Sequence, residues 1–186
     1  MINTLLKSFG TIYSSQHTNT LLKTLTAQIK WQTDFIAYGR RFDLPRRQAW
    51  YADRGVHYRN SDNKMQTQVW NEVLSSIKQN IEQLSGHQFN SVLLTYYRNG
   101  MDNVGWHADN EVELGDAPVI ASLSLGATRH FHYRNKQTSE CGSLPLYDGE
   151  LHVMQPAFQQ DWEHSILPES EVLESRINLT FRQVVC

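Results

Sequence analysis

The sequence predicts an α+β domain whose second half forms a β-sandwich or β-barrel core. Apolar residues recur at helical spacing before residue 90, and short alternating segments follow from residue 91 onward. Helices followed by a run of short strands are typical of this class. The chain has 186 residues, 40% of them hydrophobic and 19% charged, which suits one domain with a sizeable core. We find no internal repeat or low-complexity linker and therefore treat residues 1–186 as a single domain.

Helices are expected in the first ninety residues. Near the N-terminus, apolar residues at helical spacing indicate one or two short amphipathic helices packed on the outside of the domain. These residues are Leu5, Leu6, Phe9, Leu21, Leu22, Leu25 and Ile29. A clearer helix is predicted over about residues 65–84, where branched aliphatic residues recur every three or four positions, and Gly86 suits its C-terminal end.

Strands are expected from residue 91 to the C-terminus. Seven segments there are short, rich in β-branched or aromatic residues and roughly alternating. They cover residues 91–98, 104–109, 119–126, 128–134, 143–147, 150–154 and 176–185. Asp148-Gly149, between two of these segments, is typical of the turn in a tight β-hairpin.

Composition restricts the function classes. The formal net charge is -2, from 17 Lys and Arg against 19 Asp and Glu, which argues against a surface uniformly coated with positive charge. No apolar run approaches the ~20 residues of a membrane span, and residues 1–10 lack the apolar core of a signal peptide. The two cysteines, Cys141 and Cys186, cannot form a disulfide framework. We therefore expect a cytoplasmic protein, or a nuclear one in a eukaryote, without a membrane partner.

The charges are nevertheless segregated along the chain. Residues 40–59 contain six arginines, opposed there only by Asp43 and Asp53, and aromatic residues are interleaved with them. The arginines are Arg40, Arg41, Arg46, Arg47, Arg54 and Arg59, and the aromatic residues in and beside this segment are Tyr38, Phe42, Trp50, Tyr51 and Tyr58. This mixture suits phosphate contacts and base stacking, although a solvated loop with a few core aromatics would have the same composition. Residues 102–116 are acidic instead and could bind cations or stay hydrated.

Two short motifs carry possible chemistry. His107 and Asp109 are two residues apart, so on a strand both side chains would lie on one face and could bind a divalent metal. Alone, this H-x-D pattern is weak and is more typical of a surface pair. A third ligand would complete the two-histidine, one-carboxylate set typical of non-haem Fe(II) sites. Spacing does not choose between the downstream candidates, which are His130, His132, His152 and His164.

The last predicted strand has one apolar and one polar face. Its polar positions are Arg176, Asn178, Thr180 and Arg182, which alternate with Ile, Leu and Phe. Two guanidinium groups on one face could clamp a dicarboxylate, because each can bind a carboxylate through two hydrogen bonds. An ordinary half-exposed strand would show the same alternation.

Together these motifs resemble the AlkB family of Fe(II)/2-oxoglutarate-dependent dioxygenases, in the branch of human homologues two and three. The shared order is H-x-D, a histidine about fifty residues later, and R-x-N-x-T-x-R near the C-terminus. The resemblance covers at least residues 45–183. It includes Pro45-Arg46-Arg47-Gln48, Leu94-Thr95-Tyr96-Tyr97 and Ile120-Ala121-Ser122-Leu123-Ser124-Leu125-Gly126.

The resemblance implies a double-stranded β-helix, or jelly roll, with N-terminal buttressing helices and a nucleotide-recognition lid within residues 1–90 and the catalytic core within residues 91–186. It implies that His107, Asp109 and His164 hold Fe(II) as the catalytic centre, which leaves structural or pocket roles to the other three histidines. It also implies a 2-oxoglutarate site. Its residues would be Thr95, Tyr97, Arg176, Asn178, Thr180 and Arg182, with Arg176 on the far carboxylate and Thr95 where the family often has Asn.

The family reaction would consume O2 and 2-oxoglutarate, release succinate and CO2, and remove the methyl group of 1-methyladenine or 3-methylcytosine in DNA as formaldehyde. The target base must be flipped out of a duplex or already be single-stranded. The expected substrate contacts are Tyr38, Arg46, Tyr58, Asn60, Ser61 and Glu111. Asn60 stands where relatives have a stacking aromatic, and Asn110 where an Asp is common.

Several alternatives remain open at this point. The expected partner is alkylated DNA, single- or double-stranded, bound by a monomer, but an RNA demethylase or another 2-oxoglutarate-dependent hydroxylase would share the same fold. A zinc hydrolase would use the same three ligands and leave the two inward arginines unexplained. A non-catalytic nucleic-acid module would need the arginine-rich segment alone.

Overall fold

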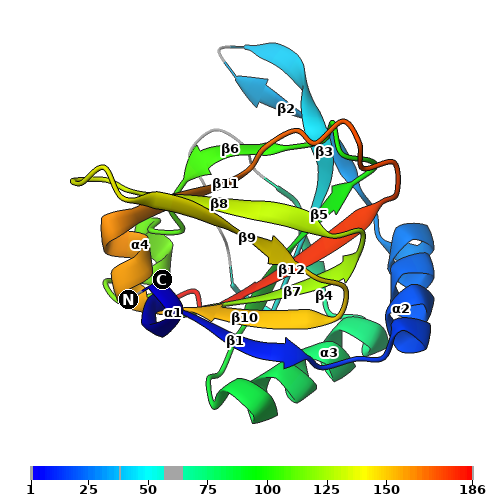
Figure 1. The fold of residues 1–186 in the computed structure, drawn as a ribbon. Coiled ribbons are helices and arrows are strands. Elements are labelled where there is room, and N and C mark those ends of the chain that lie inside the picture. The colour runs from blue at the N-terminus through cyan, green and yellow to red at the C-terminus, as the bar shows by residue number, and fades with distance from the viewer. Residues whose placement is uncertain (1, 38, 57–64, 186) are drawn as a thin grey trace.

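The structure is a computed structural model that describes residues 2–37, 39–56 and 65–185, and it contains two facing β-sheets (Figure 1). The larger sheet has the order β1 (Leu6–Thr11), β10 (Glu150–Met154), β7 (Ile120–Gly126), β12 (Arg176–Arg182), β5 (Ser91–Tyr97), β3 (Arg40–Ala52) and β2 (Gln32–Ala37), and β4 (Thr67–Val69) also pairs with β3. The smaller sheet has the order β6 (Val104–His107), β11 (Trp162–Ile166), β8 (Arg129–Asn135) and β9 (Cys141–Leu146). This arrangement confirms the predicted jelly roll.

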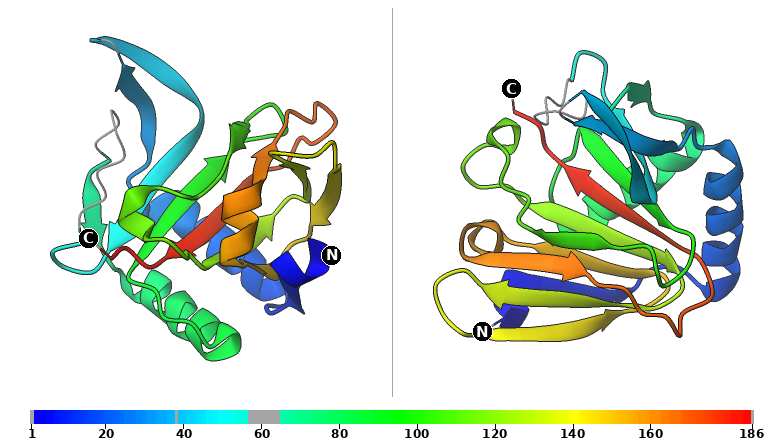
Figure 2. Two further views of the ribbon diagram at one scale, coloured as in Figure 1. Left: turned by 90° about the vertical axis from the view of Figure 1, so that its left-hand side faces the viewer. Right: turned by 90° about the horizontal axis from the view of Figure 1, so that it is seen from above.

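Four α-helices and one short 3-10 helix accompany the sheets in the described ranges. They are α1 (Ile2–Leu5), α2 (Ser15–Gln28), α3 (Glu72–Ser85), α4 (Pro156–Asp161) and the 3-10 helix Val112–Leu114. None of the described helices is long and apolar enough to cross a membrane. The helices α2 and α3 lie on the outer face of the larger sheet, as expected for buttressing helices (Figures 1 and 2).

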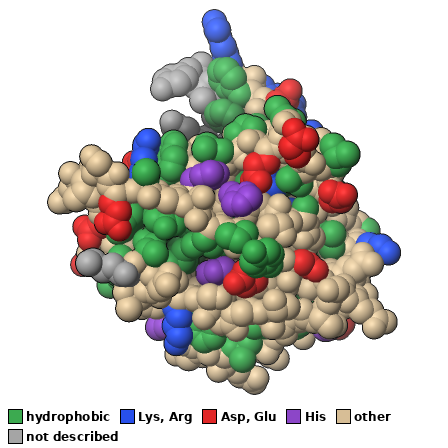
Figure 3. Space-filling view, in the orientation of Figure 1, with side chains coloured by type: hydrophobic (Ala, Val, Ile, Leu, Met, Phe, Trp, Pro, Cys, Tyr) green, Lys and Arg blue, Asp and Glu red, His purple; other side chains and the backbone are tan. Residues whose placement is uncertain are grey.

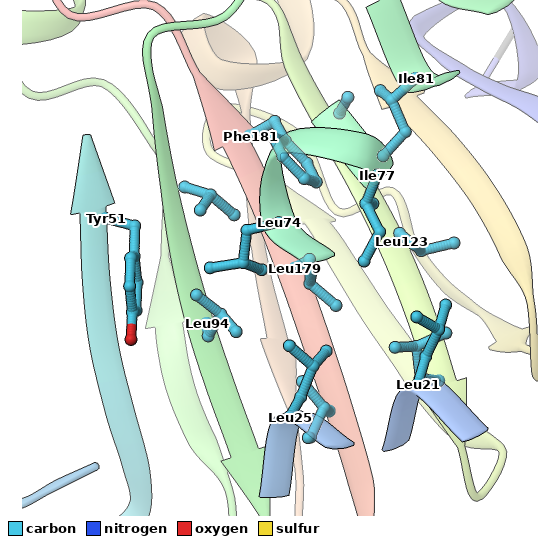
Figure 4. Packing of buried hydrophobic residues seen from close by; sticks show 14 of the residues in the cluster. Leu21, Leu25, Tyr51, Leu74, Ile77, Ile81, Leu94, Leu123, Leu179 and Phe181 are labelled. Atoms are coloured by element: carbon cyan, nitrogen blue, oxygen red, sulfur yellow. The ribbon is translucent and has the colours of Figure 1, made fainter. Parts of the chain in front are cut away.

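The core under these helices accounts for one face of the last strand. Leu25 of α2 and Leu74 of α3 pack with Leu179 and Phe181 of β12 in one buried cluster (Figure 4). All four side chains have 0% exposure, and burying each contributes about 1.5–3 kcal/mol. The polar residues of β12 alternate with these and face the second sheet, so they too lie inside the protein. An ordinary half-exposed strand is therefore excluded.

The predicted helix over residues 65–84 begins later than expected. Thr67–Val69 form β4, which pairs in parallel with β3, and the helix begins only after Asn71. The Asn71 side chain caps α3 by accepting a hydrogen bond from the backbone N–H of Leu74. Gly86 ends the helix in the left-handed conformation with a φ of 74°, as predicted.

The N-terminal half contributes more strands than the sequence predicts. The segment with Leu6 and Phe9, predicted to be helical, forms β1 and pairs with β10. Strands β2 and β3 were likewise not predicted, and β3 pairs directly with β5 of the larger sheet. Residues 1–90 therefore supply part of the jelly roll itself, because pairing with distant strands outweighs local helical spacing.

The prediction of a β-hairpin at Asp148-Gly149 is wrong. Strand β9 pairs with β8 and β10 pairs with β7 and β1, so this turn carries the chain from one sheet to the other. Asp148 fixes the crossing by accepting hydrogen bonds from the Gly126 backbone N–H at 2.7 Å and the Thr18 hydroxyl at 2.6 Å. Gly149 has a φ of 76°, and a Cβ there would lie 2.7 Å from the Tyr13 carbonyl oxygen. Asp148-Gly149 therefore forms a turn as predicted, but the strands on either side of it do not pair with each other.

The seven predicted strands of residues 91–185 are all present, with ends shifted by at most three residues. One strand there was missed. Residues Trp162–Ile166 form β11, in the middle of the smaller sheet between β6 and β8. This strand carries His164.

Candidate active site

Three candidate metal ligands meet between the two sheets. Ligand atoms of His107, Asp109 and His164 lie within 4.8 Å of one another, the only such group of three or more in the described ranges. His107 ends β6 and is the register partner of His164 in β11, while Asp109 lies two residues beyond the strand end. The two imidazole centroids are 4.2 Å apart. This donor set fits a divalent metal with open coordination positions.

Hydrogen bonding and burial prepare these side chains as ligands. The His107 Nδ1 atom lies 2.8 Å from the Gly105 carbonyl oxygen, which can only accept, so Nδ1 carries the proton and Nε2 is available to a metal. Burial, together with the neighbouring His107, lowers the pKa of His164 to about 3, so this imidazole is neutral at physiological pH. A neutral imidazole is the form that binds metals.

The carboxylate of Asp109 is held ionised. Burial by itself would raise the pKa of Asp109, but the positive charge of Arg182 outweighs it and holds the pKa below its usual range. Arg182 donates a hydrogen bond to Asp109 from the last strand. The site thus presents the Nε2 atom of His107, a neutral His164 imidazole and an ionised Asp109 carboxylate.

Beside this cluster, Arg176 is buried in a polar pocket. Its Nη2 atom donates to the Ser124 hydroxyl at 2.9 Å and to the Asn178 side-chain oxygen at 2.8 Å. Its Nε and Nη1 atoms are buried and have no hydrogen-bond partner among the described residues. The guanidinium lies 5.2 Å from the centre of the Tyr97 ring, and burial raises the pKa of Tyr97. A buried cation with free donors fits an anionic carboxylate that the protein does not itself supply.

A cavity of about 420 Å³ connects the two clusters. It is lined by His107, Asp109, His164, Thr95, Tyr97, Arg176, Asn178, Thr180 and Arg182, together with Arg46 and Glu111. The structure therefore brings eleven of the predicted site residues to one cavity. The remaining four, Tyr38, Tyr58, Asn60 and Ser61, lie outside the described residues.

The arginine-rich segment divides into a base and an exposed ribbon. Arg46 lines the cavity, donates to the Asn103 carbonyl oxygen at 3.2 Å, and has a pKa lowered by burial. Beyond it, β2 and the first half of β3 form a two-stranded ribbon that projects from the body of the protein (Figure 2). Arg40 and Arg41 are exposed on this ribbon, and Arg41 pairs with Asp34.

The other three candidate histidines lie elsewhere. His130 and His132 point outward from β8, and His130 Nδ1 lies 2.9 Å from the Glu169 carboxylate. Histidine side chains are visible on this outer face in Figure 3. His152 is buried in β10 with its Nε2 atom 3.5 Å from the Glu150 carboxylate. None of the three lines the cavity.

Two buried polar residues near the site were not predicted. Arg129 is 1% exposed and donates to Glu169 and to the carbonyl oxygens of Asp102 and Leu167, so it joins the loop before β6 to the loop after β11. Gln159 is 0% exposed and contacts the backbone of Asp109. Neither belongs to a sequence pattern, because the three partners named for Arg129 lie 27 to 40 positions away and Asp109 lies 50 positions from Gln159.

Residues 4–182 match the pattern of the 2OG-Fe(II) oxygenase superfamily. The chain belongs to this superfamily. Human alpha-ketoglutarate-dependent dioxygenase alkB homolog 3 is 39% identical over 175 residues, which cover 88% of this chain and 60% of the relative. Human DNA oxidative demethylase ALKBH2 is 31% identical over 190 residues, which cover 96% of this chain and 73% of the relative. These relatives confirm the predicted AlkB resemblance, and the chain spans about 60% of the length of alkB homolog 3.

Solved structures show the same fold. The structure of OsALKBH1 superposes with a TM-score of 0.64 at 17% identity, covering 96% of this chain and 98% of the other. A Pseudomonas putida prolyl-4-hydroxylase superposes with a TM-score of 0.61 at 14% identity, covering 97% and 94%. Both support the jelly roll expected for a 2OG-Fe(II) oxygenase.

Proposed function

We propose that this protein is an Fe(II)/2-oxoglutarate-dependent dioxygenase that demethylates N-alkylated bases in DNA. The observation that carries the proposal is one cavity containing both a two-histidine, one-carboxylate cluster and a buried arginine with unpaired donors. A hydrolytic metal site would need the two-histidine, one-carboxylate cluster but would give no role to the buried arginine.

His107, Asp109 and His164 would hold the iron, and Arg176 would bind the far carboxylate of 2-oxoglutarate. Iron, 2-oxoglutarate and O2 together would supply the oxidising chemistry: one oxygen atom would enter succinate as CO2 is released, and the other would hydroxylate the N-methyl group, which then leaves as formaldehyde. The polar row of Asn178 and Thr180 orients Arg176, because Asn178 accepts from Arg176 and donates to the Thr180 hydroxyl at 2.8 Å. The apolar ring of Phe131, 4.9 Å from that of His164, keeps this side of the site dry.

Arg46 and Glu111 support a methylated base as the substrate. 1-Methyladenine and 3-methylcytosine are cationic and carry an exocyclic amine beside the methylated nitrogen. Glu111 lines the cavity, and its Oε2 atom is buried without a hydrogen-bond partner among the described residues, so it could accept from that amine. Arg46 sits where the ribbon joins the cavity and could contact the adjacent phosphate. The ribbon β2–β3 would then serve as the nucleotide-recognition lid of a monomeric enzyme.

A mass-spectrometric screen tests this function. The purified protein is incubated with Fe(II), 2-oxoglutarate and oligonucleotides carrying 1-methyladenine or 3-methylcytosine, as single- and double-stranded DNA and as RNA, with and without a chelator. We expect chelator-sensitive loss of the methyl group from DNA, with succinate and formaldehyde formed in equal amounts. Demethylation of the RNA oligonucleotides alone would show that the substrate is RNA and not DNA. Succinate formation without demethylation of any oligonucleotide would overturn the substrate class.

A further inference from the structure

A buried amide lies next to the proposed iron ligands. Gln159 belongs to the short helix α4 and has 0% exposure, as does its neighbour Phe158. Burying a primary amide is unfavourable unless its polar atoms are hydrogen-bonded. The partners of this side chain therefore indicate why a glutamine stands at this position.

The main partner of Gln159 is the backbone of Asp109. Its Oε1 atom accepts a hydrogen bond from the Asp109 N–H at 2.8 Å, and its Nε2 atom lies 3.4 Å from the Met154 sulfur, a weak acceptor. Because the Asp109 N–H can only donate, the atom facing it must be the amide oxygen. The orientation of the amide is thus determined by its partner.

Asp109 needs such support because it lies outside the strand ladder. Strand β6 ends at His107, so the sheet does not hold the Asp109 backbone. Gln159 reaches it from α4, which leads directly into β11 and His164. Lys136 also holds α4, because its ammonium donates to the Gln159 backbone oxygen at 2.8 Å. The amide of Gln159 thus links the segment that carries one histidine ligand to the loop that carries the carboxylate.

We infer that Gln159 is a positioning residue for the metal site, which holds the Asp109 backbone so that its carboxylate and His164 meet the same ion. The inference rests on the proposed assignment of these residues as metal ligands. It adds a residue that does not touch the metal and acts through a single backbone hydrogen bond. Hydrogen-bonding partners of metal ligands typically change metal affinity by about 10- to 100-fold when they are removed.

The test compares Gln159→Leu with Gln160→Leu. Gln160 is the exposed neighbour on the same helix, and its side chain donates a hydrogen bond to the Asp116 carbonyl oxygen at 3.3 Å. The metal-free proteins are titrated with Co(II), whose visible spectrum reports binding without turnover. We expect Gln159→Leu to bind Co(II) about 10- to 100-fold more weakly and Gln160→Leu to bind as the wild type does.

Hydrogen exchange and a second variant separate positioning from folding. The Asp109 amide should exchange faster in Gln159→Leu, while amides in the β12 core keep their protection. Gln159→Glu retains an acceptor for the Asp109 N–H and should restore both Co(II) affinity and amide protection relative to Gln159→Leu. Wild-type affinity in Gln159→Leu, or equal loss in the Leu and Glu variants, would overturn the inference. If the wild-type protein binds no Co(II), or if His107→Ala binds it equally well, the proposed metal site is overturned as well.

Discussion

The cavity between the sheets, which we call the chamber, and the β2–β3 ribbon differ in how their side chains are held. In the chamber, Arg176 and Asp109 are 1% and 2% exposed. Strands on both sides fix Arg176, and hydrogen bonds with Gln159 and Arg182 hold Asp109. On the ribbon, Arg41 is 74% exposed, and the segment before Arg46 pairs only with β2 among the described residues. A cross-strand stack of Phe35 on Phe42, with ring centroids 5.4 Å apart, is its main internal packing.

The contrast separates two tasks. Chemistry at a metal needs ligands held to within fractions of an ångström, which buried strands in fixed register provide. A two-stranded ribbon with no covering layer is only marginally stable by itself and can adapt to a bound polymer. Substitutions in the chamber should therefore have large, specific effects, and substitutions on the ribbon small, salt-dependent ones.

The largest effect is expected for His107→Ala, which removes one of the three proposed ligand atoms. Formaldehyde release from a methylated oligonucleotide should fall to the level of the chelated enzyme. The matched control is His132→Ala, on the outer face of β8, which should keep full turnover. Retained turnover in His107→Ala would show that the cluster does not hold the catalytic metal.

The next largest effect is expected for Arg176→Ala. Removing one partner of a buried, hydrogen-bonded charge pair costs about 2–5 kcal/mol, so the KM for 2-oxoglutarate should rise at least ~30-fold. Arg134→Ala is the control, because Arg134 pairs with Glu163 and stacks on Trp106 on the outside of the smaller sheet. An unchanged KM in Arg176→Ala would reject the clamp.

A smaller effect is expected for Glu169→Gln, in the loop after β11 that Arg129 joins to the loop before β6. Burial by itself would raise the pKa of Glu169, but hydrogen bonds from His130 and Arg129 outweigh it and hold the pKa below its usual range. A lowered carboxyl pKa stabilises the fold above the unfolded value of about 4.3, and that stability is lost as the pH falls through the folded pKa.

Denaturant unfolding at several pH values checks this expectation. Glu169→Gln should lose about 1–3 kcal/mol at pH 7, and the difference from the wild type should shrink as the solution is acidified below about pH 4. Glu174→Gln, an exposed neighbour, is the control. A difference that stays constant down to acidic pH would contradict a role for the ionised carboxylate.

The smallest effect belongs to the ribbon. The double variant Arg40→Ala/Arg41→Ala should weaken oligonucleotide binding and reduce the slope of log affinity against log salt by about one to two, since each lost phosphate contact contributes ~0.7–0.9. The KM for 2-oxoglutarate should not change. Lys23→Ala, exposed on α2, is the control. A salt slope equal to that of the wild type would remove the ribbon from the nucleic-acid interface.

Local sequence patterns predict the structure correctly where a feature depends on a single strand or helix. The alternation over residues 176–182 correctly placed Arg176 and Arg182 on one face, and Gly86 correctly ended α3. Patterns failed where distant partners decide. Asp148-Gly149 crosses between sheets because of Gly126 and Thr18, far from it in sequence.

The opposing charges in the composition illustrate the same limit. A net charge of -2 gave no sign of a nucleic-acid surface, although the arginine cluster over residues 40–59 was evident from the sequence. The structure divides that cluster between the cavity, where Arg46 is partly buried, and the ribbon, where Arg40 and Arg41 are exposed. Burial changes what each guanidinium can do, and burial depends on the whole fold.

By itself, the sequence determined the fold class, the family resemblance and the residues able to carry the chemistry, because residue type and spacing are local properties. Only the tertiary structure placed His164 opposite His107, left two donors of Arg176 unpaired in the same cavity and put Gln159 behind Asp109. These relations join residues about fifty or more positions apart. They exist only when strands pair and two sheets close over a common interior, which excludes water and makes each polar contact specific.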